Sequence, residues 1–244
     1  MIKSINDNFI NLVCSTIKNE ESLWKLGNDV LYDLCEKNFG HKKEDEILAK
    51  IWLIGRAYAA TIERRNTDNE TEEQKRDFWH NYIKKIQESN IDEYFSNLKN
   101  KKEKTEDDIF ITYFELLKAF HSFVHMNKIS LTSKYLHFHF RDEYYIYDSK
   151  AAFSINKLIK YLKISKSEYN VDEKWNDAHF ILKEPDEEKE QSRFRDYVLF
   201  YQKCKICKNK IKETYNYDLT PRELDHLLLA IKDNPDFQFI NVLK

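Results

Sequence analysis

The stretch that decides the fold is KISLTSKYLHFHFRDEYYIYDSKAAFS, residues 128–154. Hydroxyl groups come first, and Ser130 or Thr132 can cap a helix because a short side-chain oxygen accepts an otherwise unpaired backbone N–H. Charged residues 141–143 then break the helix. The apolar run 144–147, a short strand or a buried extended segment, ends on Asp148. A second, small-residue helix is expected to follow.

The start of the first helix suits an anion, and Asp148 has two interpretations. Free N–H groups and the positive end of a helix dipole favour a phosphate. Lys134 lies about one turn further along and could face the same anion. Asp148 stands where an N-cap belongs, and these residues alone favour the interpretation that it only caps the second helix.

This order of features resembles the core of the helix-hairpin-helix DNA glycosylases. In that superfamily the apolar run ends in an aspartate needed for base excision, and the hairpin before it grips a DNA phosphate. The resemblance implies that Asp148 is this aspartate. Bifunctional members carry a lysine nucleophile eighteen residues earlier and MutY-type adenine glycosylases a serine; this chain has Ser130, as the monofunctional branch would. The usual Gly-x-Gly of the hairpin is replaced by residues 126–129, Met-Asn-Lys-Ile.

The resemblance also implies roles for neighbouring residues. The early helix of such enzymes supplies side chains that fill the hole left by an extruded base, and Arg56 and Tyr58 are the candidates; an Arg56–acid pair inside a core is the alternative. The remaining expectations are DNA contacts and a base pocket. The expected DNA contacts are Ser130, Thr132, Ser133, Lys134 and Lys150, and the expected pocket residues are His137, His139 and Tyr147.

The composition predicts an all-α protein. The 244 residues include only 3 Gly and 3 Pro, too few for the many turns of a β protein. The resemblance adds two interleaved helical lobes with a helix-hairpin-helix element and a cleft between them. We expect an N-terminal lobe at 1–104, the helix-hairpin-helix and catalytic lobe at 105–183, and C-terminal helices at 184–244 that pack back on the first lobe.

Charge and cysteine content restrict the partners. The formal net charge is −2, so a DNA-binding face would have to be local. Neither a membrane span nor a signal peptide is recognisable, which predicts a cytoplasmic protein with reduced cysteines. Cys204 and Cys207 have CxxC spacing, but no second pair completes a zinc site. We therefore expect no metal and no cofactor.

Three further stretches of the sequence carry features of helices. Residues 46–65 form an expected helix with almost no polar face, which predicts a central position. Capping boxes start at Thr71 and at Thr220. Between residues 193 and 212 seven basic residues accompany a single acid, Asp196, so this helix is either a DNA contact or ordinary surface.

Three classes of function are compatible with the sequence. The first is a monofunctional DNA N-glycosylase, a monomer acting on double-stranded DNA with modified bases. Within it, the composition resembles that of bacterial glycosylases that excise glucosylated hydroxymethylcytosine in phage defence; a repair enzyme for oxidised, deaminated or alkylated bases is the alternative. The second is a non-catalytic helical DNA-binding protein. The third is an unrelated helical protein in which Asp148 only caps a helix.

Overall fold

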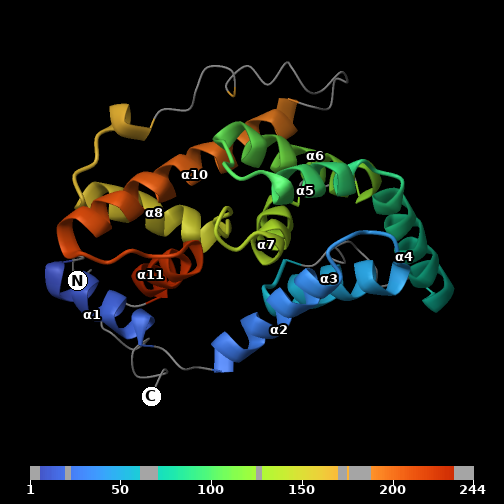
Figure 1. Cartoon of the computed structure of the whole chain (residues 1–244), viewed down its shortest axis with the longest axis horizontal. Helices are drawn as coiled ribbons and strands as arrows, with labels where there is room; N and C mark the ends of the chain where they lie inside the picture. The colour runs from blue at the N-terminus through green and yellow to red at the C-terminus, as the bar shows by residue number, and fades with distance from the viewer. Residues whose placement is uncertain are drawn as a thin grey trace. The chain divides into compact units, whose positions relative to one another are not determined.

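The computed structural model describes residues 6–19, 23–60, 71–124, 128–169, 175 and 188–233 (Figure 1). Every regular element in these ranges is a helix, which confirms the all-α prediction. The α-helices are α1 Asp7–Lys18, α2 Leu23–Lys37, α3 Glu44–Ala57, α4 Glu72–Gln87, α5 Ile91–Asn100, α6 Glu106–Val124, α7 Ile129–His139, α8 Ser149–Tyr161, α10 Glu188–Tyr215 and α11 Pro221–Asp233, with a 3-10 helix, η1, at Lys166–Tyr169.

The chain folds into two compact units. Unit 1 combines Met1–Leu26 with Tyr145–Lys244, and unit 2 is the continuous stretch Gly27–Tyr144. Helices α1, α8, α10 and α11 therefore belong to unit 1, while α3 to α7 and most of α2 belong to unit 2. This grouping places the boundaries elsewhere than the three consecutive segments expected from the sequence, because the first helix packs with the last ones.

Unit 2 is assembled on α7. This helix contacts both α3 and α6, and nine of its eleven residues are buried. Polar residues are among them, and their groups are satisfied locally. Thr132 Oγ1 donates to the Lys128 carbonyl at 3.0 Å, and Ser133 Oγ donates to the Ser130 carbonyl at 3.0 Å. These bonds allow a helix with hydroxyl groups to lie in a core.

Unit 1 is built on the packing of α8 against α11. The stripe Ala151, Ile155 and Leu158 is buried, as the i, i+4, i+7 spacing requires of the core face of a helix. Helix α1 packs on α11, and Lys18 bonds to the Asp218 carbonyl and to Glu223. The first and last described helices thus hold unit 1 together.

Three local predictions can be compared with the structure. Both capping boxes are confirmed, since Thr71 and Gln74 bond reciprocally, as do Thr220 and Glu223. The prediction that Ser130 or Thr132 caps the first helix is wrong, because α7 begins at Ile129 with Lys128 at the N-cap. Helix α7 starts earlier because its N-terminal turn is buried against its neighbours.

The third helix is shorter and less uniformly buried than predicted. Helix α3 ends at Ala57, and Ala59 adopts a left-handed backbone with φ 50°, which a helix cannot continue through. Trp52 is 43% exposed and Leu53 42%, whereas Lys50 is fully buried. The face of α3 that points inward is therefore the one that carries a lysine.

The described residues were also compared with the expectations for cysteines, metal ligands and membrane spans. All four cysteines are there, buried and free, and burial raises the thiol pKa of Cys204. In those ranges no three His, Cys, Asp or Glu side chains are grouped as metal ligands would be. Helices long and apolar enough to cross a bilayer are likewise not found among the residues that the structure covers.

The packing of α8 on α11 makes a testable prediction. Leu158→Ala should lower the free energy of unfolding by about 2–5 kcal/mol, because it leaves a cavity in the core of unit 1. Leu12→Ala is the matched control, since Leu12 is 44% exposed on α1 and should cost less than about 1 kcal/mol. Urea unfolding followed by circular dichroism measures both. Equal losses at the two positions would contradict the burial of this face.

Candidate functional site

Asp148 ends an extended segment and begins α8. Its backbone lies at φ −154° and ψ 179°, and its carboxylate Oδ1 accepts a hydrogen bond from the Ala151 N–H at 2.9 Å. The segment 144–147 before it forms no strand. The side chain is half-buried. The sequence correctly predicted Asp148 as an N-cap, and the cap fixes the direction in which the carboxylate points.

Ser130 lies on the first turn of α7 beside Lys134. The Lys134 ammonium donates to Ser130 Oγ at 2.9 Å and to the Tyr58 carbonyl at 3.2 Å. Lys134 is only 2% exposed, and Thr132 and Ser133 are fully buried. Surface contacts of these three side chains with a DNA phosphate are therefore not supported, because their polar groups bond within unit 2. Lys134 faces Ser130 instead of an anion.

The two candidate wedge residues differ in exposure. Arg56 is exposed in the last turn of α3, with its guanidinium 4.3 Å from the centre of the Trp52 ring. Tyr58 is half-buried, its hydroxyl donates to the Asn28 side chain, and its ring packs on Phe138. Arg56 is thus exposed on unit 2, whereas Tyr58 helps to bind α3, α2 and α7 together.

The predicted pocket residues come from both units, His137 and His139 from unit 2 and Tyr147 from unit 1. His137 is fully buried, and its ring contacts the Tyr32 hydroxyl at 2.6 Å and the Tyr144 carbonyl at 2.8 Å. Tyr147 packs against Phe200 of α10. His139 lies on another side of α7 from His137. Asp148, Tyr147 and Lys150 belong to unit 1, and the other predicted site residues belong to unit 2.

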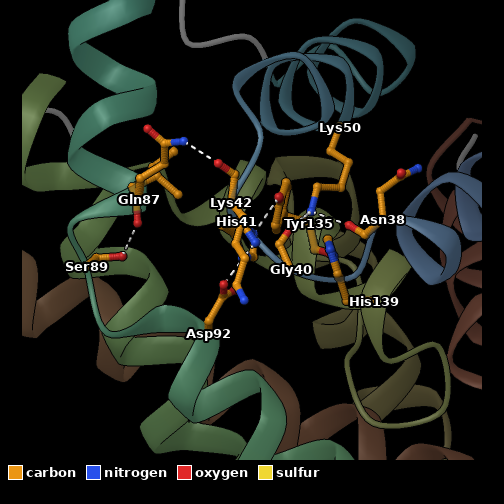
Figure 2. A network of polar contacts seen from close by, with 11 residues as sticks. Asn38, Gly40, His41, Lys42, Lys50, Gln87, Ser89, Asp92, Tyr135 and His139 are labelled. Carbon is orange, nitrogen blue, oxygen red and sulfur yellow. Dashed lines mark hydrogen bonds and ion pairs between the residues drawn. The ribbon is translucent and has the colours of Figure 1, made fainter.

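A polar network that the sequence did not reveal lies in unit 2 (Figure 2). His41, in the connection between α2 and α3, contacts Asp92 of α5 and Tyr135 of α7. Its Nδ1 is 2.6 Å from the Asp92 carboxylate, so Nδ1 carries the proton, and its Nε2 accepts from the Tyr135 hydroxyl at 2.8 Å. Burial would raise the pKa of Asp92, but the hydrogen bonds from His41 outweigh it and lower this pKa.

Lys50 supplies the second half of the network. Its ammonium donates to the carbonyls of Asn38 and Gly40, at 2.7 and 2.8 Å. Burial lowers the pKa of Lys50 to about 8. His139 lies beside it in the network, with Nδ1 donating to the Tyr135 carbonyl at 2.8 Å and a buried Nε2 that has no hydrogen-bond partner. Figure 2 shows these groups around the α2–α3 connection.

The groups of the network are arranged in the order of an acid–base relay, but the hydroxyl at its end is not accessible to a substrate. A carboxylate, an imidazole and a hydroxyl follow one another, as in a catalytic triad. Tyr135 is fully buried, however, and burial raises its pKa well above the usual range, which opposes formation of a nucleophilic phenolate. The arrangement therefore serves to hold α3, α5 and α7 to one loop. An accessible lysine with a pKa near 8 would be a competent amine nucleophile, but Lys50 is enclosed.

A cavity of about 250 Å³ opens beside the network. His139 lines it, together with aromatic and charged side chains of α2, α5 and α7 and of the segments that follow these helices. The aromatic residues are Tyr32, Phe39, Phe138 and Phe140, and the charged residues are Glu36, Lys99, Lys104, Arg141, Asp142 and Glu143. Opposite charges balance around the rim, and Lys104 pairs with Glu143. The lining therefore combines aromatic rings with equal numbers of positive and negative side chains, which gives no net preference for an anion.

Besides His139, which was expected in a base pocket, only Lys50 of this network left a signal in the sequence. Lys50 follows Ile47 by three residues and precedes Ile54 by four, so a lysine stands in the buried stripe of an apolar helix. Such a charge needs buried partners. His41 and Asp92 are 51 residues apart and stand in no recognisable motif.

Comparison of the chain with protein-family models, with curated proteins and with solved structures finds no match. The geometry described above therefore carries the functional argument alone.

Two histidines of the network, His41 and His139, predict acid sensitivity. Burial lowers the pKa of His41 and lowers that of His139 well below its ordinary value. The unfolded chain binds protons at both residues below about pH 6.5, so stability present above that pH is lost as the pH falls. Each histidine contributes a slope of up to about 1.4 kcal/mol per pH unit. Lys50 and Asp92 contribute little between pH 5 and 7, where each is charged in both states.

Urea unfolding at a series of pH values from 7.5 to 5.5 measures this slope. His139→Phe should flatten it by about one proton, because a ring of similar shape remains and the titrating group is removed. His80→Asn, a change at an exposed histidine of α4, should leave the slope unaltered. An identical slope in wild type and His139→Phe would show that His139 does not resist protonation.

Proposed function

We propose that the protein is a monofunctional DNA N-glycosylase in which Asp148 is the essential carboxylate. The observation that carries the proposal is the local geometry of residues 129–161. Helix α7 is followed by a break, by extended backbone, and then by a half-buried aspartate fixed at the start of α8. This is the order of features that the resemblance to helix-hairpin-helix glycosylases requires. Of residues 126–129, which replace the glycine hairpin, 126 and 127 are outside the described residues, while Lys128 at the N-cap and Ile129 begin α7.

The division of the chain gives further support. Interleaved lobes are expected of this superfamily, and here two separated segments make unit 1 while the intervening segment makes unit 2. Ser130 belongs to unit 2 and Asp148 to unit 1.

The reaction assigned to Asp148 is the hydrolysis of a sugar–base bond. The bond between deoxyribose C1′ and the base nitrogen breaks, and positive charge develops on the sugar. A carboxylate directed at C1′ stabilises that charge. Water then supplies hydroxide to C1′ and a proton to the departing base, which leaves an abasic site. The nucleotide must first leave the stack, and exposed Arg56 is the candidate to occupy the emptied space.

The proposed substrate is a bulky modified base in duplex DNA, with glucosylated hydroxymethylcytosine of phage DNA as the first candidate. A large polar substituent would let the enzyme refuse unmodified DNA, because a site built for its hydroxyl groups is left unsatisfied without them. A repair activity on oxidised, deaminated or alkylated bases is the alternative within the same reaction class.

Asp148→Asn tests the catalytic role. Asparagine caps a helix about as well as aspartate, so this variant keeps α8 and removes only the charge. Base release from DNA with glucosylated cytosines, read as alkali-labile sites, should be abolished while the circular dichroism spectrum and unfolding midpoint stay near wild type. Asp142→Asn, at an exposed acid of the preceding segment, should release base normally. Full activity of Asp148→Asn would refute the assignment and favour a capping role alone.

The monofunctional assignment has a separate test. A β-lyase needs an amine to form a Schiff base with the sugar, and the chain has Ser130 at the corresponding position, with the nearby Lys134 amine buried and hydrogen-bonded. Borohydride should therefore trap no protein–DNA adduct during base release. An adduct that forms in wild type and disappears in Lys134→Ala would show that this lysine is the nucleophile.

A further inference from the structure

Helix α8 presents a basic surface on the side opposite its buried stripe. Phe153, Asn156, Lys157 and Lys160 recur at i, i+3, i+4 and i+7, and so lie on one side of the helix. Phe153 is 45% exposed, an unusual position for a large apolar ring. Helix α8 contains no Asp or Glu between residues 149 and 161. The positive charge on this side is therefore not offset within the helix.

Neighbouring helices add lysines to the same surface. Lys157 of α8 and Lys232 of α11 place their ammonium groups 4.4 and 4.1 Å from the centre of the Phe153 ring. Lys203 of α10 donates to Asn156 Oδ1 at 2.8 Å. We call this set of Phe153, Asn156, Lys157, Lys160, Lys203 and Lys232 the α8 lysine face.

The pKa of Lys203 responds to charged groups from neighbouring elements of the α8 lysine face. Burial lowers the pKa of Lys203, and the charge of Lys166 in η1 adds to that effect. Asp196 of α10 acts in the opposite direction and offsets part of the charge. Ammonium groups contributed by α8, α10, α11 and η1 thus stand near one another on a protein whose formal net charge is −2. Such a local concentration attracts a polyanion.

We infer that the α8 lysine face binds a nucleic acid. The Lys157 and Lys232 ammonium groups, which lie over the Phe153 ring in the free protein, move to the phosphate backbone, and the ring then stacks on an unpaired base. An exposed aromatic ring with several lysines beside it supplies the two elements of single-strand recognition, a ring that can stack on a base and positive charge for the backbone. A lipid surface fits less well, because the apolar residues of α8 other than Phe153 are mostly buried and leave no broad face to insert.

This inference rests on the proposed function only in taking a nucleic acid as the ligand. It deepens the proposed function by placing the contact with the DNA phosphate backbone in unit 1. Thr132, Ser133 and Lys134, which the sequence suggested as phosphate ligands, are buried in unit 2. The α8 lysine face follows Asp148 on the same helix. It would hold the strand that carries the nucleotide to be excised.

Salt-dependent binding of unmodified oligonucleotides tests the lysines without any reaction. Each lysine–phosphate contact contributes about 0.7 (single strand) to 0.9 (duplex) to the slope of log affinity against log salt. Lys157→Gln/Lys203→Gln/Lys232→Gln should reduce this slope by about 2 and weaken binding at low salt by about a hundredfold or more. Lys42→Gln/Lys84→Gln/Lys85→Gln removes the same charge from exposed positions in unit 2 and should change the slope by less than about 0.5. Equal effects of the two triple variants would overturn the inference.

Phe153 provides a second, independent readout. Phe153→Leu keeps the apolar bulk and should weaken single-strand binding about 5- to 100-fold, whereas Phe153→Trp should retain it. Equal affinity of all three proteins would refute the stacking role. Binding of phosphatidylserine vesicles that is lost in the same lysine triple variant, without loss of oligonucleotide binding, would assign the face to membranes instead.

Base release separates this inference from the proposed function. If the lysine triple variant loses oligonucleotide binding and no modified DNA loses a base in the presence of the protein, the α8 lysine face is a nucleic-acid-binding surface and the glycosylase proposal is wrong. If glucosylated DNA loses bases and the triple variant keeps the wild-type salt slope and KM, the glycosylase proposal is supported and the α8 lysine face does not bind the nucleic acid.

Discussion

A buried ammonium group organises unit 2. Lys50 lies inside α3 with its charge among carbonyl oxygens of the α2–α3 connection, and removal of those N–H donors would leave the oxygens buried without partners. Because Lys50 fixes the α2–α3 connection in place, His41 of that connection hydrogen-bonds to both Asp92 and Tyr135. Three helices that are distant in sequence thereby meet at one loop. The two hydrogen bonds from the Lys50 ammonium to these carbonyls offset part of the cost of burying the charge.

Local signals predicted the elements of the fold well. Few glycines and prolines implied long helices, and the caps at Thr71, Asp148 and Thr220 depend on residues within three positions of one another. The end of α3 was missed because tertiary packing decided it; the apolar pattern continues past Ala57, while the backbone turns at Ala59. The exposure of Trp52 follows from the same cause, since an apolar helix has more than one face that could point inward.

The candidate site was predictable in part, for a physical reason. Asp148 is defined by its own turn of helix and could be read from sequence. The expected phosphate ligands of α7 could not, because a serine or threonine hydroxyl either faces an anion or bonds back to a carbonyl of its own helix, and only burial distinguishes the two. The lysines around Phe153 come from three helices, so their proximity depends on tertiary structure alone.

The interrupted course of the chain through unit 1 has a consequence for synthesis. Lys18 finds its partner carbonyl at Asp218, 200 residues later, so α1 emerges from the ribosome long before the helices it packs on. The amphipathic α1 must remain without its native neighbours during most of translation, while the continuous stretch of unit 2 is already complete. Closure of so long a loop adds little entropic cost per extra residue, but it fixes the order of events. Unit 2 can fold while the chain is being made, and unit 1 only after α11 has been made.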